Sequence, residues 1–342
     1  MSERKIGFGL IGAGLWGQAH AEVYATHPKA KLIAVCDLDI HKAKSLAQKY
    51  GVKAYDKVEQ LLAESGVEAV GIATPDFAHR DPVVAAANAG KHILLEKPLA
   101  TTGEDIEIIT EAVQKNGVRL MVDFHARWNP PYAIAKQTIE EGKLGDVISA
   151  YYRLNDVISV PLNMLSWSQQ SSILWFLGSH AVDTLRWMLH DEVERVYAVS
   201  RSVVLKSKGY NVPDIYQTTL EFKSGIIAQI ENNWIVPNTQ PNVNDMKLNV
   251  LGSKGMMDMD LSNNGAFRRY FEESHDHPDI LVKPYVHGKH VGFAYEAIRD
   301  FVDRLADQQD FVTDLEDGIK VSKTILAIME SVKTKQPVTV KY

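Results

Sequence analysis

Gly12-Ala13-Gly14-Leu15-Trp16-Gly17 follows the apolar run Ile6–Ile11 without a break. The run predicts a short buried strand, and Leu15–Thr26 predicts a helix after the glycine turn. In a dinucleotide fold, Gly12 lets the chain turn, Gly14 lets a pyrophosphate approach, and Gly17 lets the helix pack on the strand. The first-turn N–H groups, which include those of Leu15 and Trp16, then face the phosphate oxygens. A glycine turn without a ligand remains the alternative.

Composition and charge narrow the classes of partner. The 342 residues suggest about two domains. A net charge of −6 without a basic run argues against nucleic acid, and no apolar run reaches the roughly 18–20 residues of a membrane span. Cys36 is the single cysteine, which excludes an internal disulfide and fits a reducing compartment. We therefore expect a cytoplasmic protein with no membrane partner.

Asp37 ends the second expected strand, twenty residues beyond Gly17. A dinucleotide fold places there the carboxylate that accepts hydrogen bonds from the adenosine ribose. Its charge would repel a 2′-phosphate, and Leu38 follows it instead of an arginine or serine, so NAD is favoured over NADP. His41 and Lys42 lie close enough in sequence to weaken that preference.

Strands and helices alternate through the first third of the chain. This alternation predicts an α/β domain, a doubly wound parallel sheet of the Rossmann type, over residues 1–124. Ligands bind such sheets at the carboxyl ends of the strands, where Thr74 and Lys97 join the glycine turn and Asp37. We interpret this domain as NAD-binding. Its expected strands after the first are Lys31–Asp37, Lys53–Tyr55, Ala69–Ala73, His92–Leu95 and Arg119–Asp123.

Lys97 is the first candidate for chemistry. It ends a strand beside Pro98, which fixes the local backbone. Partial burial near a bound nicotinamide would lower the pKa of this lysine into the range useful for proton transfer. The alternative is a lysine that pairs with Glu96 or is simply solvated.

Three motifs resemble the Gfo/Idh/MocA oxidoreductases, the relatives of glucose–fructose oxidoreductase and inositol dehydrogenase. The resemblance implies that Lys97 is the active-site lysine. It also implies that Thr74, Pro75 and His79 lie along the nicotinamide half of the cofactor, and we place Glu96 in the same cofactor-binding set. The motifs are TPDFAH at residues 74–79, GKH at residues 90–92 and EKPLA at residues 96–100.

A second domain is expected at residues 125–342, because Pro130 and Pro131 end the alternation. Its longer strands are rich in Val, Ile, Tyr and Thr, which predicts an α+β domain with a largely antiparallel, open sheet. The free face of such a sheet suits a subunit interface, and the resembled family assembles through it, so we expect a homodimer or homotetramer. The expected strands are Asp146–Asn155, Val193–Val204, Ile215–Phe222, Ile226–Ile235 and Asp245–Leu251.

The second domain carries three candidate polar side chains. Arg127 could meet substrate hydroxyls or brace the domain interface. On the expected helix Leu174–Leu189, His180 and Asp183 share a face, and a carboxylate beside an imidazole fixes its tautomer and raises its basicity. A histidine satisfied in the core or at the surface is the alternative. The G-x-H-x-x-D run resembles that of the family, which implies that His180 contacts the hydroxyl being oxidised.

Phe176 departs from the family pattern. The resembled dehydrogenases usually carry an aspartate four residues before this histidine, and a phenyl ring neither accepts a proton nor bonds a hydroxyl. Either Lys97 and His180 suffice, or Asp156 or Asp183 supplies the acid. Trp175 and Phe176 could instead form an apolar platform for a sugar ring.

Four histidines cluster near the C-terminus, in Ser274–His277 and His287–His290. Histidine and aspartate can bind zinc, but proline and glycine interruptions predict a solvated or substrate-facing loop. We therefore expect no metal site.

The sequence supports three hypotheses for function. The first is an NAD-dependent oxidoreductase that oxidises a secondary hydroxyl of a sugar, inositol or related polyol, with Lys97 and His180 as the acid/base pair. The second is an NAD-dependent glycoside-cleaving enzyme whose redox steps cancel. The third is a non-catalytic NAD-binding sugar sensor, which the loss of the acid at Phe176 allows and the presence of Lys97 and His180 opposes.

Overall fold

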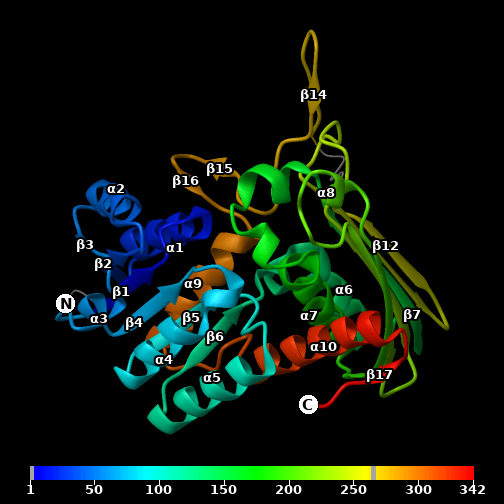
Figure 1. Ribbon diagram of the computed structural model, residues 1–342, viewed down its shortest axis with the longest axis horizontal. Helices are drawn as coiled ribbons and strands as arrows, with labels where there is room; N and C mark the ends of the chain where they lie inside the picture. The colour runs from blue at the N-terminus through cyan, green and yellow to red at the C-terminus, as the bar shows by residue number, and fades with distance from the viewer. Residues whose placement is uncertain (1–3, 263–266) are drawn as a thin grey trace. The chain divides into compact units, whose positions relative to one another are not determined.

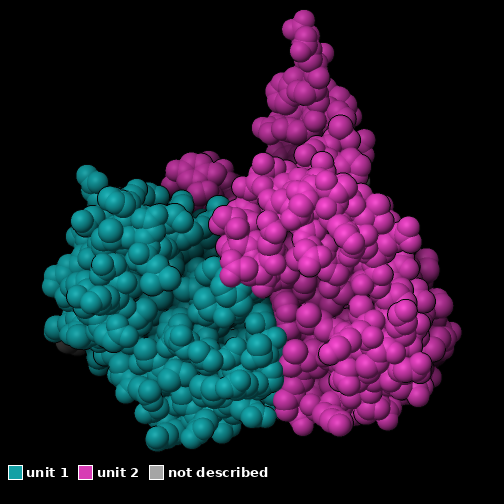
Figure 2. All heavy atoms as spheres, in the orientation of Figure 1, with its two compact units in different colours: residues 1–125, 294–322 teal, residues 126–293, 323–342 magenta. Residues whose placement is uncertain are grey.

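The computed structural model describes residues 4–262 and 267–342. The chain forms two compact units (Figure 2). The first contains the residues up to His125 together with Ala294–Ser322, and the second contains Ala126–Phe293 together with Lys323–Tyr342. The sequence did not predict the return of Ala294–Ser322 to the first unit, because nothing in this amphipathic segment shows which sheet it covers.

The first unit is built on a six-stranded parallel sheet with strand order β3-β2-β1-β4-β5-β6 (Figure 1). This order confirms the doubly wound α/β fold that the sequence predicted. Because β1 and β4 are neighbours, the direction of winding reverses between them, and ligands bind such sheets at the carboxyl ends of strands beside that point. The strands are β1 (Ile6–Ile11), β2 (Ala30–Cys36), β3 (Lys53–Tyr55), β4 (Ala69–Ile72), β5 (His92–Glu96) and β6 (Leu120–Asp123).

Helices cover both faces of this sheet. Phe8 and Gly9 point to opposite faces of β1 because side chains alternate along a strand. The Phe8 ring stacks on Tyr24 at 4.3 Å between centroids and meets Phe301 at 6.2 Å. A Cβ on Gly9 would lie 2.5 Å from Leu61, which packs on the other face. The helices are α1 (Leu15–Thr26), α2 (Ile40–Tyr50), α3 (Val58–Leu62), α4 (Arg80–Asn88), α5 (Gly103–Asn116) and α9 (Phe293–Ala306), with the short turn η1 (Asp76–Ala78); the short turn η2 (His125–Trp128) leads into the second unit.

The second unit is built on a seven-stranded sheet with strand order β12-β11-β7-β10-β9-β8-β17. The β7–β10 pair is parallel and the other pairs are antiparallel, which confirms the largely antiparallel sheet. Helices α6 and α7 lie on one face of the sheet (Figure 1). The strands are β7 (Val147–Asp156), β8 (Val193–Arg201), β9 (Ile215–Phe222), β10 (Ile227–Asn233), β11 (Asn244–Gly252), β12 (Met256–Asp260) and β17 (Val338–Thr339); the helices are α6 (Pro130–Glu140), α7 (Ser179–Leu189), α8 (Val204–Ser207) and the end of α10 (Leu315–Thr334).

The sequence missed several short elements of the second unit. The expected helix Leu174–Leu189 is a π-turn, η5 (Leu174–Gly178), followed by α7. The expected histidine loop instead forms two short hairpins, with His275 in β14 and His290 in β16. The short elements that were not predicted, apart from η5, are η3 (Val160–Met164), η4 (Ser168–Gln170), β13 (Arg269–Tyr270), β14 (His275–Asp276), β15 (Tyr285–Val286) and β16 (Lys289–His290). Within residues 4–262 and 267–342, no helix has the length and apolar character needed to cross a membrane.

Candidate active site

The glycine turn between β1 and α1 has the geometry that the motif requires. Gly12 has φ +97°, and a Cβ there would lie 2.5 Å from the carbonyl oxygen of Ala73. A Cβ on Gly17 would lie 2.0 Å from the carbonyl oxygen of Gly12. Larger residues at these two positions would therefore push the turn away from β4 or the helix away from the turn.

Gly14 is different, because the protein itself does not require a glycine there. Its φ is −72°, and a Cβ at Gly14 would meet no protein atom within 4 Å. Gly14 is the N-cap of α1, where no side chain caps the helix and the first turn holds no acidic residue. Leu15 beside it is half-exposed, and Trp16 is partly buried. An open N-terminus of this kind fits the pyrophosphate of a dinucleotide.

Asp37 lies just beyond the end of β2 and is partly buried. Its Oδ2 accepts a hydrogen bond from the N–H of Ala13 at 2.7 Å, and its Oδ1 accepts one from Asp39 at 2.9 Å. The carboxylate thus joins the end of β2 to the glycine turn. Each carboxylate oxygen keeps a further lone pair with which it can accept a ribose hydroxyl.

His79 connects the turn that follows β4 to the segment that follows β5. Its Nδ1 lies 2.7 Å from the carbonyl oxygen of Pro98, and its Nε2 lies 3.2 Å from that of Thr74. Burial lowers the pKa of this imidazole, although both carbonyls act in the opposite direction. His79 therefore holds the Thr74–Pro75 turn against the segment that carries Lys97, and its contact with cofactor stays a prediction.

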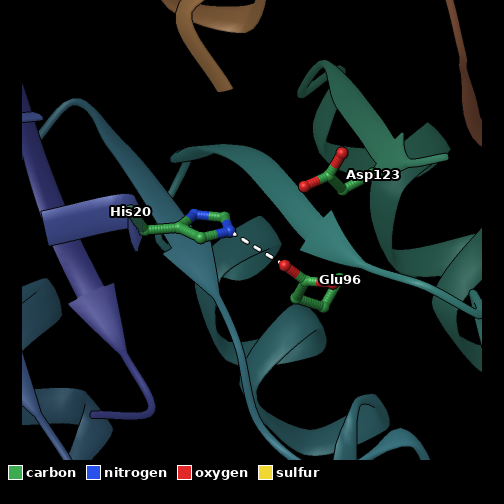
Figure 3. Close-up of side chains that lie close together, drawn as sticks. All are labelled: His20, Glu96 and Asp123. Carbon is green, nitrogen blue, oxygen red and sulfur yellow. Dashed lines mark hydrogen bonds and ion pairs between the residues drawn. The ribbon is translucent and has the colours of Figure 1, made fainter. Parts of the chain in front are cut away.

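Glu96 ends β5 and Lys97 follows it directly, and both are buried. The Oε1 of Glu96 lies 3.1 Å from the Nε2 of His20 on α1. With Asp123 at the end of β6, these two residues form a buried cluster (Figure 3) that was not predicted from the sequence. The three residues of the cluster are far apart in sequence. In the sequence, the one feature that pointed to the cluster was the position of Asp123 at the end of an expected strand.

In the second unit, Asp183 lies in the first turns of α7 with His180, and both are buried. Asp183 accepts hydrogen bonds from the Nε of Arg127 at 3.0 Å and from its Nη2 at 2.6 Å. From the sequence, Asp183 was expected beside the imidazole, and Arg127 was expected to meet substrate or to brace the domain interface. The structure pairs these two residues with each other, and the action of Asp183 on His180 and the roles of both residues toward substrate stay predictions.

The remaining candidates lie near α7 in sequence or in the sheet. Asp156 ends β7, is buried and accepts a hydrogen bond from the side chain of Asn244. Phe176 lies in η5, and its ring centroid is 6.2 Å from those of Trp167 and Trp234. Trp175 is 4% exposed, which leaves little of it to form a platform. Phe176 is only partly buried and keeps an apolar edge at this position.

The doubly wound parallel sheet, with the glycine turn and Asp37 at the carboxyl ends of its strands, defines a dinucleotide-binding enzyme of the Rossmann class. Residues 6–124 match the model of an oxidoreductase family with an NAD-binding Rossmann fold, and residues 132–258 match the GFO/IDH/MocA C-terminal domain. The chain belongs to the Gfo/Idh/MocA family of oxidoreductases, and NAD is its cofactor.

Relatives and solved structures agree with this assignment. The chain is 29% identical to an inositol 2-dehydrogenase of Salmonella typhimurium, over 87% of this chain and 85% of the relative. It is 30% identical to the scyllo-inositol 2-dehydrogenase (NAD(+)) of Bacillus subtilis, over 74% and 73%. The fold matches that of scyllo-inositol dehydrogenase from Lactobacillus casei, solved with NAD(H) and scyllo-inositol, with a TM-score of 0.82 and 20% identity over 98% and 99% of the two chains.

Proposed function

We propose that the chain oxidises a secondary hydroxyl of an inositol or a related cyclic polyol. The proposal rests on one observation above all, the buried Lys97 at the carboxyl end of β5, on the edge of the sheet that carries the glycine turn and Asp37. The relatives named inositol dehydrogenases extend over most of the chain, which supports the choice of substrate class.

Lys97 and His180 are proposed as the groups that handle the hydroxyl proton. When bound, NAD accepts a hydride from the carbinol carbon. The hydroxyl must lose its proton as this happens, and His180 is proposed as the base, with Lys97 bonded to the same oxygen. A positioned base contributes about 10²–10⁴ in rate. Lys97 belongs to the first unit and His180 to the second, so their joint action is a proposal about the working enzyme.

Asp183 and Arg127 are proposed as positioning residues. Their bidentate ion pair ties the segment before α6 to the first turns of α7, which carry His180. Asp156 is proposed as the carboxylate that meets substrate in place of the family aspartate. Phe176 is proposed to face the C–H side of the polyol ring, and Trp175 to support it from below.

The exposed face of the second sheet is proposed as the interface of a homodimer or homotetramer. On that face the strands expose large apolar side chains where a monomer would carry polar ones. We expect light scattering to show an oligomer and Ile227→Glu to shift it toward the monomer. A monomeric wild-type protein would contradict this part of the proposal. The exposed side chains are Tyr151, Tyr197, Val199, Ile227 and Leu251.

A panel of cyclic polyols tests the function directly. Purified protein is mixed with NAD and with myo-inositol, scyllo-inositol, levoglucosan or glucose, and reduced cofactor is followed by absorbance. We expect turnover with at least one inositol, and loss of turnover with retained NAD binding in Lys97→Ala. Release of an aglycone from a glycoside without net reduction, or binding of a sugar without any turnover, would replace the proposal by one of the other two hypotheses. Full activity of Lys97→Ala would remove Lys97 from the mechanism.

A further inference from the structure

The cluster of His20, Glu96 and Asp123 lies in the first unit, on three separate elements. His20 comes from α1, Glu96 ends β5 and Asp123 ends β6 (Figure 3). One nitrogen or oxygen from each residue lies within 4.8 Å of those of the others. His20 and Asp123 are 0% exposed and Glu96 is 4% exposed. The proposed reaction does not use this cluster.

Asp123 is the feature that packing does not explain. Neither of its carboxylate oxygens has a hydrogen-bond partner in the described protein. Its nearest ion-pair neighbour is the Nδ1 of His125 at 3.8 Å, which is beyond hydrogen-bond distance. One oxygen points toward the His20–Glu96 pair (Figure 3). A buried carboxylate without hydrogen bonds is costly, and such groups are usually paired or bound to a metal ion.

The surroundings of His20 suit a metal ligand. Its Nδ1 lies 3.0 Å from the hydroxyl of Tyr24, so a proton on Nδ1 would leave the Nε2 lone pair facing Glu96 and Asp123. A second hydrogen bond of this kind orients most metal-binding histidines. The backbone leaves room for it, because a Cβ on Gly71 would lie 2.7 Å from that Nδ1 and 2.6 Å from the Tyr24 hydroxyl.

The charge and size of the cluster select the class of ion. Asp123 and Glu96 bring two carboxyl groups to one buried place, beside the imidazole of His20. Zinc binds imidazole nitrogen and carboxylate oxygen at about 2.0–2.2 Å in a tetrahedral arrangement, which places two ligand atoms roughly 3.3–3.6 Å apart. The Nε2 of His20 and the Oε1 of Glu96 are 3.1 Å apart, and all three ligand atoms lie within 4.8 Å of one another, so a movement of about 1 Å brings them to that spacing.

We propose that His20, Glu96 and Asp123 bind one divalent transition-metal ion of the Zn²⁺ or Mn²⁺ class. The ion joins α1 to the ends of β5 and β6 and so fixes the backbone directly before Lys97. Three protein ligands leave a coordination position that a water molecule fills.

The test measures metal directly and requires no turnover. Full-length protein is treated with EDTA, dialysed, and titrated calorimetrically with Zn²⁺ and separately with Mn²⁺; protein purified without chelator is assayed for bound metal. We expect one tightly bound ion per chain in the wild type. Asp123→Asn keeps the shape of the side chain, His20→Gln replaces the imidazole by an uncharged polar group, and each should weaken that binding at least tenfold. Glu96 is left unchanged because it adjoins Lys97.

Two control variants separate this site from adventitious binding. His27→Gln removes another histidine of α1's end, which pairs with Asp303, and should leave the tight ion in place. The double variant His275→Gln/His277→Gln removes one exposed and one partly buried histidine of the second unit and should also retain the ion. Absence of a tight ion in the wild type, undiminished binding in Asp123→Asn, or loss of the ion in the double variant would each overturn the proposal. The wild-type titration decides the matter even where a variant fails to fold.

Discussion

Arg127 donates two hydrogen bonds to Asp183, and both side chains are buried. The planar guanidinium and the carboxylate meet in the bidentate geometry that only arginine provides. This pair joins two segments of the second unit that are fifty-six residues apart. The pair therefore stabilises the second unit and also fixes the position of α7.

Arg127→Ala is expected to cost about 3–5 kcal/mol in the free energy of unfolding, because it leaves Asp183 buried without this partner. Arg127→Lys should also destabilise, since an ammonium cannot form both hydrogen bonds. Urea unfolding followed by circular dichroism measures the change. The exposed pair of Arg195 with Glu221 is the matched control, and Arg195→Ala should cost no more than about 1 kcal/mol. An equal cost for the two alanine variants would contradict the structural role given to Arg127.

Gly14 and Gly17 are expected to respond in opposite ways to a single methyl group. Gly14→Ala fills open space, so its free energy of unfolding should stay within about 1 kcal/mol of the wild type. The methyl group should still weaken NAD binding at least tenfold, because it occupies the approach of the pyrophosphate. Gly17→Ala should destabilise the fold by about 2 kcal/mol or more, since its Cβ meets the Gly12 carbonyl. Calorimetry with NAD and urea unfolding separate the two effects, and tight NAD binding by Gly14→Ala would exclude the glycine turn as the phosphate site.

Asp37 and Leu38 are expected to set the preference between cofactors. Leu38 is 94% exposed, so an arginine there would reach solvent and a 2′-phosphate without disturbing the core. The double variant Asp37→Ser/Leu38→Arg should raise the ratio of kcat/KM for NADP over NAD by about tenfold to a hundredfold, as expected for about 1.4–2.8 kcal/mol. Leu38→Ala is the control and should leave the ratio unchanged. An unaltered ratio in the double variant would show that the ribose is bound elsewhere.

The sequence predicted the first sheet almost completely, but it did not predict which side chains of the candidate site contact one another. The strands Ile6–Ile11 and Lys53–Tyr55 were predicted with the bounds that the structure shows, and the other strands of this sheet differ by one residue at one or both ends. Strand and helix periodicity report local burial, which is why they succeed. The Arg127–Asp183 pair and the contact of His20 with Glu96 join distant segments. A local sequence pattern does not show which distant side chains meet in the folded chain, so these contacts could not be predicted.

Acidification is expected to destabilise the protein through the buried side chain of His79. Burial lowers the pKa of His79 in the folded state, so between that value and the ordinary one of about 6.5 the unfolded chain binds more protons. The stability that this group contributes is therefore complete above about pH 6.5 and is lost as the pH falls through the folded value. Urea unfolding across this range should show a shallower pH dependence in His79→Gln than in the wild type. His41→Gln, at an exposed position, should keep the wild-type dependence. If the free energy of unfolding of His79→Gln varied with pH as steeply as that of the wild type, His79 would not be a source of the pH dependence.

Phe176 and Asp156 together test how the chain replaces the family aspartate. Phe176 contacts two tryptophan rings, so Phe176→Asp places a carboxylate among aromatic side chains and should cost about 1–3 kcal/mol without raising kcat. Phe176→Leu, the control, keeps the site apolar and should leave kcat close to that of the wild type.

Asp156→Asn preserves the shape of the side chain and removes its charge. If Asp156 supplies the missing carboxylate, kcat should fall by about 10²–10⁴ while NAD binding is retained. The two variants test different positions. Asp156→Asn tests whether the carboxylate at the end of β7 is needed, and Phe176→Asp tests whether a carboxylate in η5 adds activity. A large gain in kcat for Phe176→Asp, with Asp156→Asn fully active, would mean that the site lacks an acid and that Lys97 and His180 work without one.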